Sequence, residues 1–200
     1  MKHDVTDQKL LDTFQALFDF TFKGTYTRDR QGGRVPKKLV LQKAIKVHND
    51  QNWHEFQEAR GQVGPKVRQY QNNLKNAGHD TNLWTFPESN VGPPLTKQCE
   101  DNLRKQGKWA LDDDLKEDEC GEFWFWHGTS LAGANGITSG DFRVDLAGSN
   151  AGTLYGNGVY LAENCSKSDE YTTPVPNSGA EPDRILLLCR GLVGTIFKKN

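Results

Sequence analysis

The sequence lacks the signatures of membrane and secreted proteins. No stretch approaches the ~20 consecutive apolar residues that a membrane-spanning helix needs. The first residues, MKHDVTDQKLLDTF, carry acidic side chains where a secretory signal peptide has a basic segment followed by an apolar one. We therefore expect a soluble intracellular protein without a membrane partner, with cytoplasm and nucleus both open.

An excess of one charge is also missing. The chain has 25 Lys and Arg residues against 26 Asp and Glu residues, a net charge of −1. A nucleic-acid-binding domain usually carries a clear basic excess. Residues 21–70 hold 11 basic and four acidic side chains, but few aromatic residues lie among them. A solvated surface is therefore favoured over a nucleic-acid face.

The common metal and nucleotide motifs are absent as well. Glu58 stands where a HExxH zinc motif starting at His54 needs its second histidine, and Leu161 stands where GxGxxG needs its third glycine. The cysteines form no CxxC pair, so we expect no metal and, in a reducing compartment, free thiols. They are Cys99, Cys120, Cys165 and Cys189.

The 200 residues fit one domain with appendages. Apolar residues at helical spacing predict a helix within residues 1–22, either a docking helix or the end of a longer protein. Alternating apolar residues between positions 39 and 47 predict a strand, and Asn49 or Asp50 can cap a helix after it. We divide the chain into an N-terminal helix with a basic lead-in, residues 1–35, and a main domain, residues 36–200.

The rest of the main domain changes character at about residue 123. Glycines and prolines interrupt residues 61–122, which predicts an irregular insertion with one short helix around residues 95–105. The acidic run from Asp112 to Glu119 predicts a solvated loop. Nine of the 20 glycines then lie between Gly121 and Gly158, among short β-rich runs. These runs cover residues 123–126, 158–162 and 185–193. Short strands with dense turns predict an α+β fold.

The segment FWFWHGT from residue 123 is the first candidate site. On a strand, Phe123, Phe125 and His127 share one face while two tryptophans take the other, so the strand is buried on both sides. His127 lies at its end, before a glycine that lets the backbone approach a ligand closely. A single histidine of this kind is more often a satisfied core residue.

Two further segments gain meaning beside it. In the predicted strand 158–162, Tyr160 lies between Gly158 and Ala162 on its face, which leaves room for a flat ring against the phenol. In SKSDEY, Ser168 and Tyr171 are three residues apart and fall on one helix face, although helix capping alone explains this pattern.

Together, the His-Gly-Thr, Gly-x-Gly-Val-Tyr and Ser-x-x-Tyr segments resemble the catalytic domain of the poly(ADP-ribose) polymerase family. This family is the diphtheria-toxin-like branch of the ADP-ribosyltransferases. Residues 185–190 resemble its next core strand, and residues 39–60 resemble its opening strand and helix. The resemblance implies an ADP-ribosyltransferase-like split-sheet core with an N-terminal strand and helix and peripheral helices.

The resemblance also implies roles in binding NAD+, which is consumed as a substrate. His127 would hydrogen-bond the adenine-side ribose, and the Gly128 backbone would hold the nicotinamide carboxamide with the Ser168 hydroxyl. Tyr171 would stack on the nicotinamide ring, with Tyr160 close by. Two further residues, Thr129 and Arg143, would line the adenosine half. His127 and Tyr160 are the implied catalytic residues.

One member of the family pattern has no counterpart. The family usually places a catalytic Glu on a later strand, whereas this chain ends soon after residue 193. Strand alternation puts Glu163 opposite Tyr160, so it is a poor substitute. We expect a truncated enzyme without its last strands, which moves ADP-ribose to an acceptor, most simply a protein. The alternative is a non-catalytic module that keeps the NAD pocket for binding.

Overall fold

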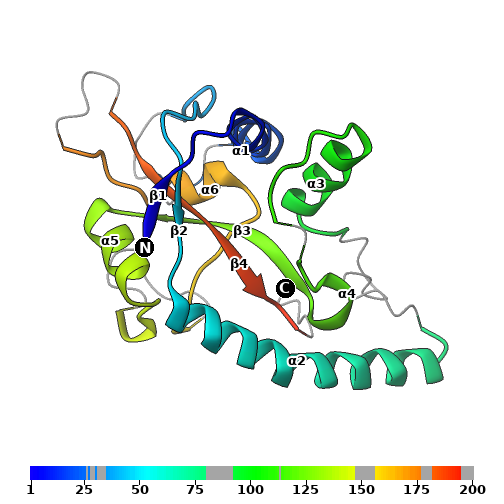
Figure 1. Ribbon diagram of the computed structural model, residues 1–200. Helices are drawn as coiled ribbons and strands as arrows, with labels where there is room; N and C mark the ends of the chain where they lie inside the picture. Colours follow the sequence, from blue (N-terminus) through cyan, green and yellow to red (C-terminus); the bar gives the residue numbers. More distant parts are fainter. Residues whose placement is uncertain are drawn as a thin grey trace.

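The computed structural model describes residues 1–25, 27, 30, 35–79, 92–112, 114–146, 156–176 and 182–194. This part of the chain combines helices with two small antiparallel sheets (Figure 1), so the predicted α+β class is confirmed. Within these ranges, no helix is both long and apolar enough to cross a membrane.

The central element is the antiparallel pair of β3 (Glu122–Thr129) and β4 (Ile185–Leu192). The two strands cross the middle of the molecule in Figure 1 and pair along their whole lengths, from Glu122 opposite Leu192 to Thr129 opposite Ile185. Both strands were predicted from their β-rich sequences, and the prediction is confirmed.

The core lies on the tryptophan face of β3. Trp124 and Trp126 belong to a buried cluster with Leu17 and Cys99. Phe123 lies on the other face of the strand, where its ring makes a T-shaped contact with the other phenylalanine of β3. The alternation predicted for this strand is therefore confirmed. Trp126 also donates its indole N–H to the buried Thr21 hydroxyl at 3.0 Å, which satisfies its one polar atom.

Helix α1 (Gln8–Thr21) supplies the opposite wall of that core. It begins where the Asp7 carboxylate accepts a hydrogen bond from the Leu10 N–H at 2.8 Å, a regular N-cap. Leu17 is fully buried, and Phe18 stacks on Trp126 with ring centroids 5.0 Å apart. The helix predicted within residues 1–22 is confirmed, and its apolar side faces the core shared with β3.

Helix α2 (Asp50–Asn76) begins as predicted, with the Asn49 side chain as its N-cap, but it ends much later. We expected Gly61 and the Gly64-Pro65 pair to open an irregular insertion, and this is wrong. Gly64 is buried, and a Cβ atom there would lie 3.5 Å from the Glu119 carbonyl oxygen. The backbone of α2 therefore packs closely on the short helical segment that contains Glu119. This packing carries the helix past its proline.

Two helices lie in the described part of the remaining insertion. Helix α3 (Leu95–Lys105) matches the predicted short helix, whereas α4 (Glu117–Cys120) turns the end of the acidic run into one helical turn. The solvated loop predicted there is wrong for this part, because Glu117 pairs with Lys97 of α3 at 3.1 Å. Gly121 ends α4 at φ +66°, a left-handed conformation that favours glycine. Residues 80–91 lie outside the described part.

The strand predicted between positions 39 and 47 is mostly wrong. Only β2 (Ile45–Val47) forms, and it pairs with β1 (Lys2–Asp4). Earlier in the segment, the Gln15 side chain of α1 binds the Leu39 carbonyl at 3.0 Å and the Leu41 N–H at 2.9 Å. One amide side chain thus satisfies the backbone groups that a neighbouring strand would pair.

The strand predicted for residues 158–162 is also wrong. Only Ala162 pairs with β3, through two backbone hydrogen bonds of 2.8 and 2.9 Å to Trp126. Gly156 has a φ of +92°, and the Tyr160 hydroxyl donates back to its carbonyl at 2.7 Å. The segment therefore bends locally instead of continuing the pairing, and residues 159–161 are all exposed.

Candidate functional site

His127 occupies the end of β3 and connects it to the Tyr160 segment. Its Nδ1 lies 2.9 Å from the Tyr160 carbonyl oxygen. Because a carbonyl oxygen only accepts, Nδ1 is the protonated nitrogen in this contact, and in the neutral ring Nε2 is then an acceptor. The Phe142 ring packs edge-on against the imidazole, with centroids 5.1 Å apart. These contacts fix the ring and its tautomer.

Gly128 lies directly against the short helix α6 (Cys165–Asp169). A Cβ atom at this position would lie 1.7 Å from the Ser168 carbonyl oxygen. The glycine is therefore required by the packing of α6 on β3, in addition to any approach of a ligand that the sequence suggested. Gly128 and Ser168, far apart in the sequence, are thus neighbours.

Ser168 and Tyr171 are close in space but differ in exposure. Ser168 is 3% exposed and Tyr171 is 39% exposed. The helix ends at Asp169, and the Tyr171 N–H donates to the Ser168 carbonyl at 3.1 Å, so the two residues are joined by a turn. The Lys167 ammonium lies 5.1 Å from the centre of the Tyr171 ring.

The aromatic ring of Tyr160 is partly exposed to solvent. It is 41% exposed, and a side chain added at Gly158 would meet nothing within 4 Å. The space beside the phenol that the sequence suggested is therefore present, although the regular strand geometry is not. Tyr160, His127, Gly128 and Ser168 are the residues that the described contacts bring together.

Thr129 and Arg143 are not joined to this group by any described contact. Thr129 ends β3, opposite Ile185, and precedes Ser130, the N-cap of α5 (Leu131–Ser139). Arg143 is exposed, and its Nε lies 2.8 Å from the Asp145 carboxylate. This hydrogen bond raises the pKa of Arg143 and lowers the pKa of Asp145.

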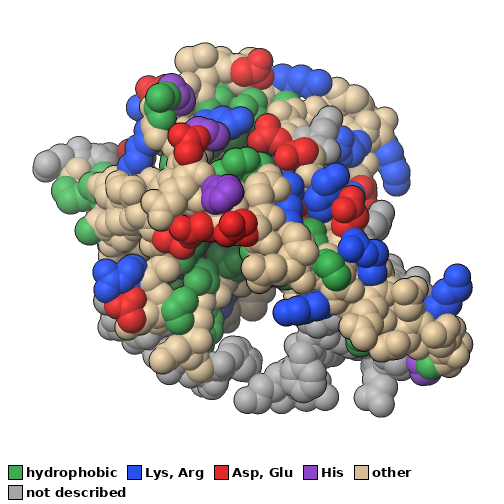
Figure 2. Space-filling view, turned by 60° about the horizontal axis from the view of Figure 1, so that its bottom comes forward, with side chains coloured by type: hydrophobic (Ala, Val, Ile, Leu, Met, Phe, Trp, Pro, Cys, Tyr) green, Lys and Arg blue, Asp and Glu red, His purple; other side chains and the backbone are tan. Residues whose placement is uncertain are grey.

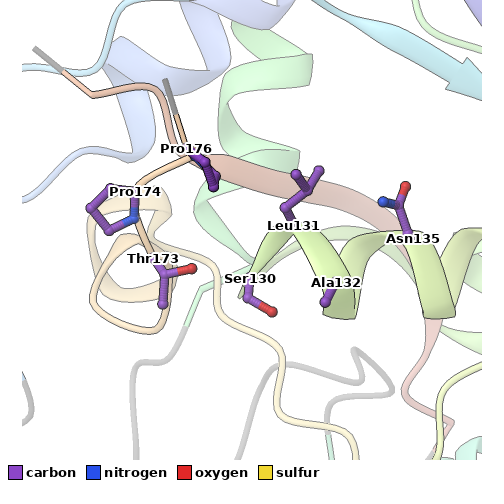
Figure 3. Close-up of a pocket in the computed structure, with 7 residues that line it drawn as sticks. All are labelled: Ser130, Leu131, Ala132, Asn135, Thr173, Pro174 and Pro176. Atoms are coloured by element: carbon purple, nitrogen blue, oxygen red, sulfur yellow. The ribbon is translucent and has the colours of Figure 1, made fainter. Parts of the chain in front are cut away.

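A shallow open depression lies beside the site and was not predicted. It encloses about 420 Å³ between the start of α5 and the loop after α6, and apolar atoms form most of its walls (Figure 3). None of the predicted site residues lines it, and no motif signalled it. Its lining residues are Ser130, Leu131, Ala132, Asn135, Thr173, Pro174 and Pro176.

The two glutamates nearest the tyrosines of the site in the sequence have other partners. Glu163 accepts a hydrogen bond from the Leu95 N–H, at the start of α3, at 3.0 Å. Glu170 is buried and bonds the Thr27 hydroxyl at 2.6 Å and the Lys167 ammonium at 2.8 Å. Both carboxylates therefore already accept hydrogen bonds within the protein.

Charges of both signs are intermixed on the face shown in Figure 2, and the far part of α2 projects from the body with Lys and Arg side chains. Across the described ranges, no three His, Cys, Asp or Glu side chains are grouped as metal ligands. All four cysteines are free thiols, as predicted.

The family model of the poly(ADP-ribose) polymerase catalytic domain matches residues 22–200. The chain belongs to this family. The poly(ADP-ribose) polymerase domain therefore covers nearly the whole chain, including the insertion and most of the basic lead-in, and its family activity is ADP-ribosyl transfer from NAD+. A search among curated proteins finds no match.

Proposed function

We propose that this chain binds NAD+, breaks the bond between nicotinamide and ribose, and transfers ADP-ribose to an acceptor, most simply a protein. The observation that carries the proposal is the meeting of His127, Gly128, Tyr160 and Ser168 at one end of β3. They come from three separate segments that the family motif predicts to converge.

The geometry supports a role for each group. Gly128 lies against the Ser168 backbone, so the two residues are close enough to bind one carboxamide. Tyr160 and Tyr171 are each about two-fifths exposed, so each has ring surface for the nicotinamide. The Nε2 atom of neutral His127 accepts a hydrogen bond, which suits a ribose hydroxyl. Thr129 and Arg143 remain proposed for the adenosine half.

In the proposed reaction, the C–N glycosidic bond breaks and its electron pair leaves with nicotinamide. The ribose becomes a cationic, oxocarbenium-like sugar, which an acceptor lone pair attacks as the acceptor loses its proton. The protein contributes orientation of the two reactants and electrostatic stabilisation of the developing cation. We propose the split-sheet core of the family as the frame for this site.

A second function has a specific observation in its favour. Glu163 and Glu170 are the glutamates nearest the tyrosines in the sequence, and both already have partners, at α3 and at Thr27 with Lys167. A module that binds NAD+ without cleaving it fits the residues of the chain that the structure describes.

One experiment separates the two functions. The chain is incubated with NAD+ labelled in its adenine half and a protein acceptor, and nicotinamide release, label transfer and NAD+ binding are measured. Transfer that His127→Ala abolishes supports the transferase. Binding that needs His127, with no nicotinamide released, supports the module. His54→Ala is the control, because His54 is an exposed histidine of α2. Absence of NAD+ binding by a folded protein rules out both functions.

A further inference from the structure

Helix α6 carries Ser168 and leads into Tyr171, yet it has little intrinsic stability. It is five residues long, and its N-cap residue, Asn164, makes no capping bond with its side chain. Isolated helices of this length are unstable in water, because the nucleation cost exceeds what one turn of hydrogen bonds returns. The position of Ser168 and Tyr171 therefore depends on what holds α6 from outside.

The end of α6 also carries two buried acidic side chains. The side chains of Asp169 and Glu170 are 3% and 2% exposed, and the two residues lie between Ser168 and Tyr171 in the sequence. Carboxylates at the C-terminus of a helix face the negative end of its dipole, and buried like charges repel each other. This end of the helix needs a cation to stay in place.

Lys167 of α6 pairs with Glu170, and Arg30, which follows α1 in the sequence, provides the cation for Asp169. Its side chain is 8% exposed, and its Nη1 lies 3.0 Å from the Asp169 carboxylate. Its Nη2 donates to the Ser166 carbonyl at 3.0 Å, and its Nε lies 3.8 Å from the Glu170 carboxylate. One planar guanidinium thus contacts both ends of the short helix, which the compact charge of a lysine could not do as well.

Two other residues that follow α1 also bind α6 or the residue after it. Thr27 donates its hydroxyl to Glu170 at 2.6 Å, and the Lys23 N–H donates to the Ser166 hydroxyl at 2.9 Å. Lys23, Thr27 and Arg30 therefore lie along α6, and their bonds go to residues close to Ser168 and Tyr171 in sequence. Of these three, Arg30 makes the charged contact to Asp169.

We propose that Arg30 is a positioning residue, which holds α6 so that Ser168 and Tyr171 form the nicotinamide end of the site. This inference rests on the proposed binding of NAD+. Arg30 acts through α6, whereas the ribose contact proposed for His127 comes from β3. Loss of Arg30 should therefore damage one half of the site and spare the other.

The test uses two probes, benzamide for the nicotinamide end and ADP-ribose for the rest, titrated calorimetrically into the full chain. We expect Arg30→Met to raise the Kd of benzamide about tenfold, which corresponds to about 1.4 kcal/mol, and to change that of ADP-ribose by roughly twofold at most. Arg104→Met is the control. Arg104 pairs with the buried Glu100 within α3, so this substitution breaks a similar ion pair in another part of the protein.

The outcomes are distinct. Equal weakening of both probes, or no change in benzamide affinity, overturns the positioning role. If Arg30→Met does not fold, Arg30→Lys decides in the same titrations, because it keeps the charge and loses the two-armed grip: selective loss of benzamide affinity supports the role, and unchanged affinity overturns it. A wild-type chain that binds neither probe overturns the proposed function itself.

Discussion

At the scale of single residues, the proposed ligand-binding groups differ in exposure. Tyr160 and Tyr171 are about 40% exposed, whereas Ser168 is almost fully buried. His127 lies between these cases, since one ring nitrogen is used by the Tyr160 backbone. Substitutions at the exposed tyrosines should therefore affect binding far more than folding.

We expect Tyr160→Ala to weaken benzamide binding while the free energy of unfolding changes by less than about 1 kcal/mol. The ring is 41% exposed, and substitutions at exposed positions usually have small effects on stability. Urea denaturation and benzamide titration of the same preparation measure both quantities. Tyr70→Ala, an exposed tyrosine of α2, is the matched control. A large loss of stability together with unchanged binding would contradict the assigned role.

The buried thiols give a pH-dependent prediction. Burial raises the pKa of Cys99 and of Cys165 from 9.0 to about 11. A raised pKa in the folded state means that the thiol stays protonated there while the unfolded chain ionises. The contribution to stability is therefore complete below about pH 9 and is lost as the pH rises toward 11.

At pH 8 we expect iodoacetamide to modify Cys99 and Cys165 far more slowly in the native protein than in the urea-unfolded chain, because the thiolate is the reactive form. Peptide mass spectrometry of timed samples gives the two rates. Urea melts at pH 8 and at pH 10 should show the loss of stability with rising pH, and a double Cys→Ser variant should show less of it. Equal native and unfolded rates would contradict the burial.

Gly128 allows a prediction about packing alone. In Gly128→Ala the new Cβ would lie 1.7 Å from a backbone oxygen of α6, so strand and helix must separate. We expect a lower Tm and loss of benzamide binding. Gly136→Ala is the control, because a Cβ there meets nothing within 4 Å and alanine favours the helix. A Gly128→Ala variant with wild-type Tm would mean that α6 is not packed this closely.

At the scale of elements, the sequence predicted what local rules decide. Apolar spacing predicted the helix within residues 1–22, the cap at Asn49 predicted the start of α2, and alternation predicted both faces of β3. The full length of α2 depends on its packing against α4, which no local pattern reveals. The strand predicted at 39–47 forms only at its end, because the Gln15 side chain binds backbone groups before it. The strand predicted at 158–162 does not form, because the chain turns at Gly156 and His127 binds the Tyr160 carbonyl.

Part of the candidate site was also predictable from local sequence patterns. Its motif residues are read directly from the sequence, and the contacts between β3, the Tyr160 segment and α6 unite them. The support from Arg30 was not predictable, since it joins residues more than a hundred positions apart and belongs to no motif of the sequence analysis. The depression beside α5 depends likewise on tertiary placement.

The start of α3 provides a prediction at this scale. Pro94 makes no side-chain cap, and Glu163 instead accepts from the Leu95 N–H across the chain. We expect Glu163→Ala to lower the free energy of unfolding by about 1 kcal/mol, from the lost cap and its interaction with the helix dipole. Urea denaturation measures this loss, and Glu58→Ala, at an exposed acid of α2, is the control. Unchanged stability with loss of ADP-ribosyl transfer would instead identify Glu163 as catalytic.

At the scale of the whole molecule, β3 carries different tasks at its two ends. His127 and Gly128 lie at the site, whereas Glu122 begins the strand and is fully buried. Its carboxylate accepts from Arg190 of β4 at 2.6 Å and from Arg60 of α2 at 2.6 and 2.9 Å. Three elements are thus joined through one carboxylate at the end of the strand away from the site.

Glu122→Gln tests whether the two ends are separable. The substitution removes the buried charge between two arginines, which are only 11% and 13% exposed and whose other acidic partner, Asp114, is largely exposed. Removing one partner of a buried ion pair typically costs about 3–5 kcal/mol, so we expect a large fall in Tm. We also expect the folded variant to bind ADP-ribose and benzamide as the wild type does, because the lost contacts lie at the other end of β3. Calorimetry well below the new Tm measures the binding, and Glu119→Gln, at an exposed acid of α4, is the control for the change of charge. Weakened binding in a fully folded Glu122→Gln protein would show that the strand transmits the disturbance along its length, so that the anchor and the site act as one unit.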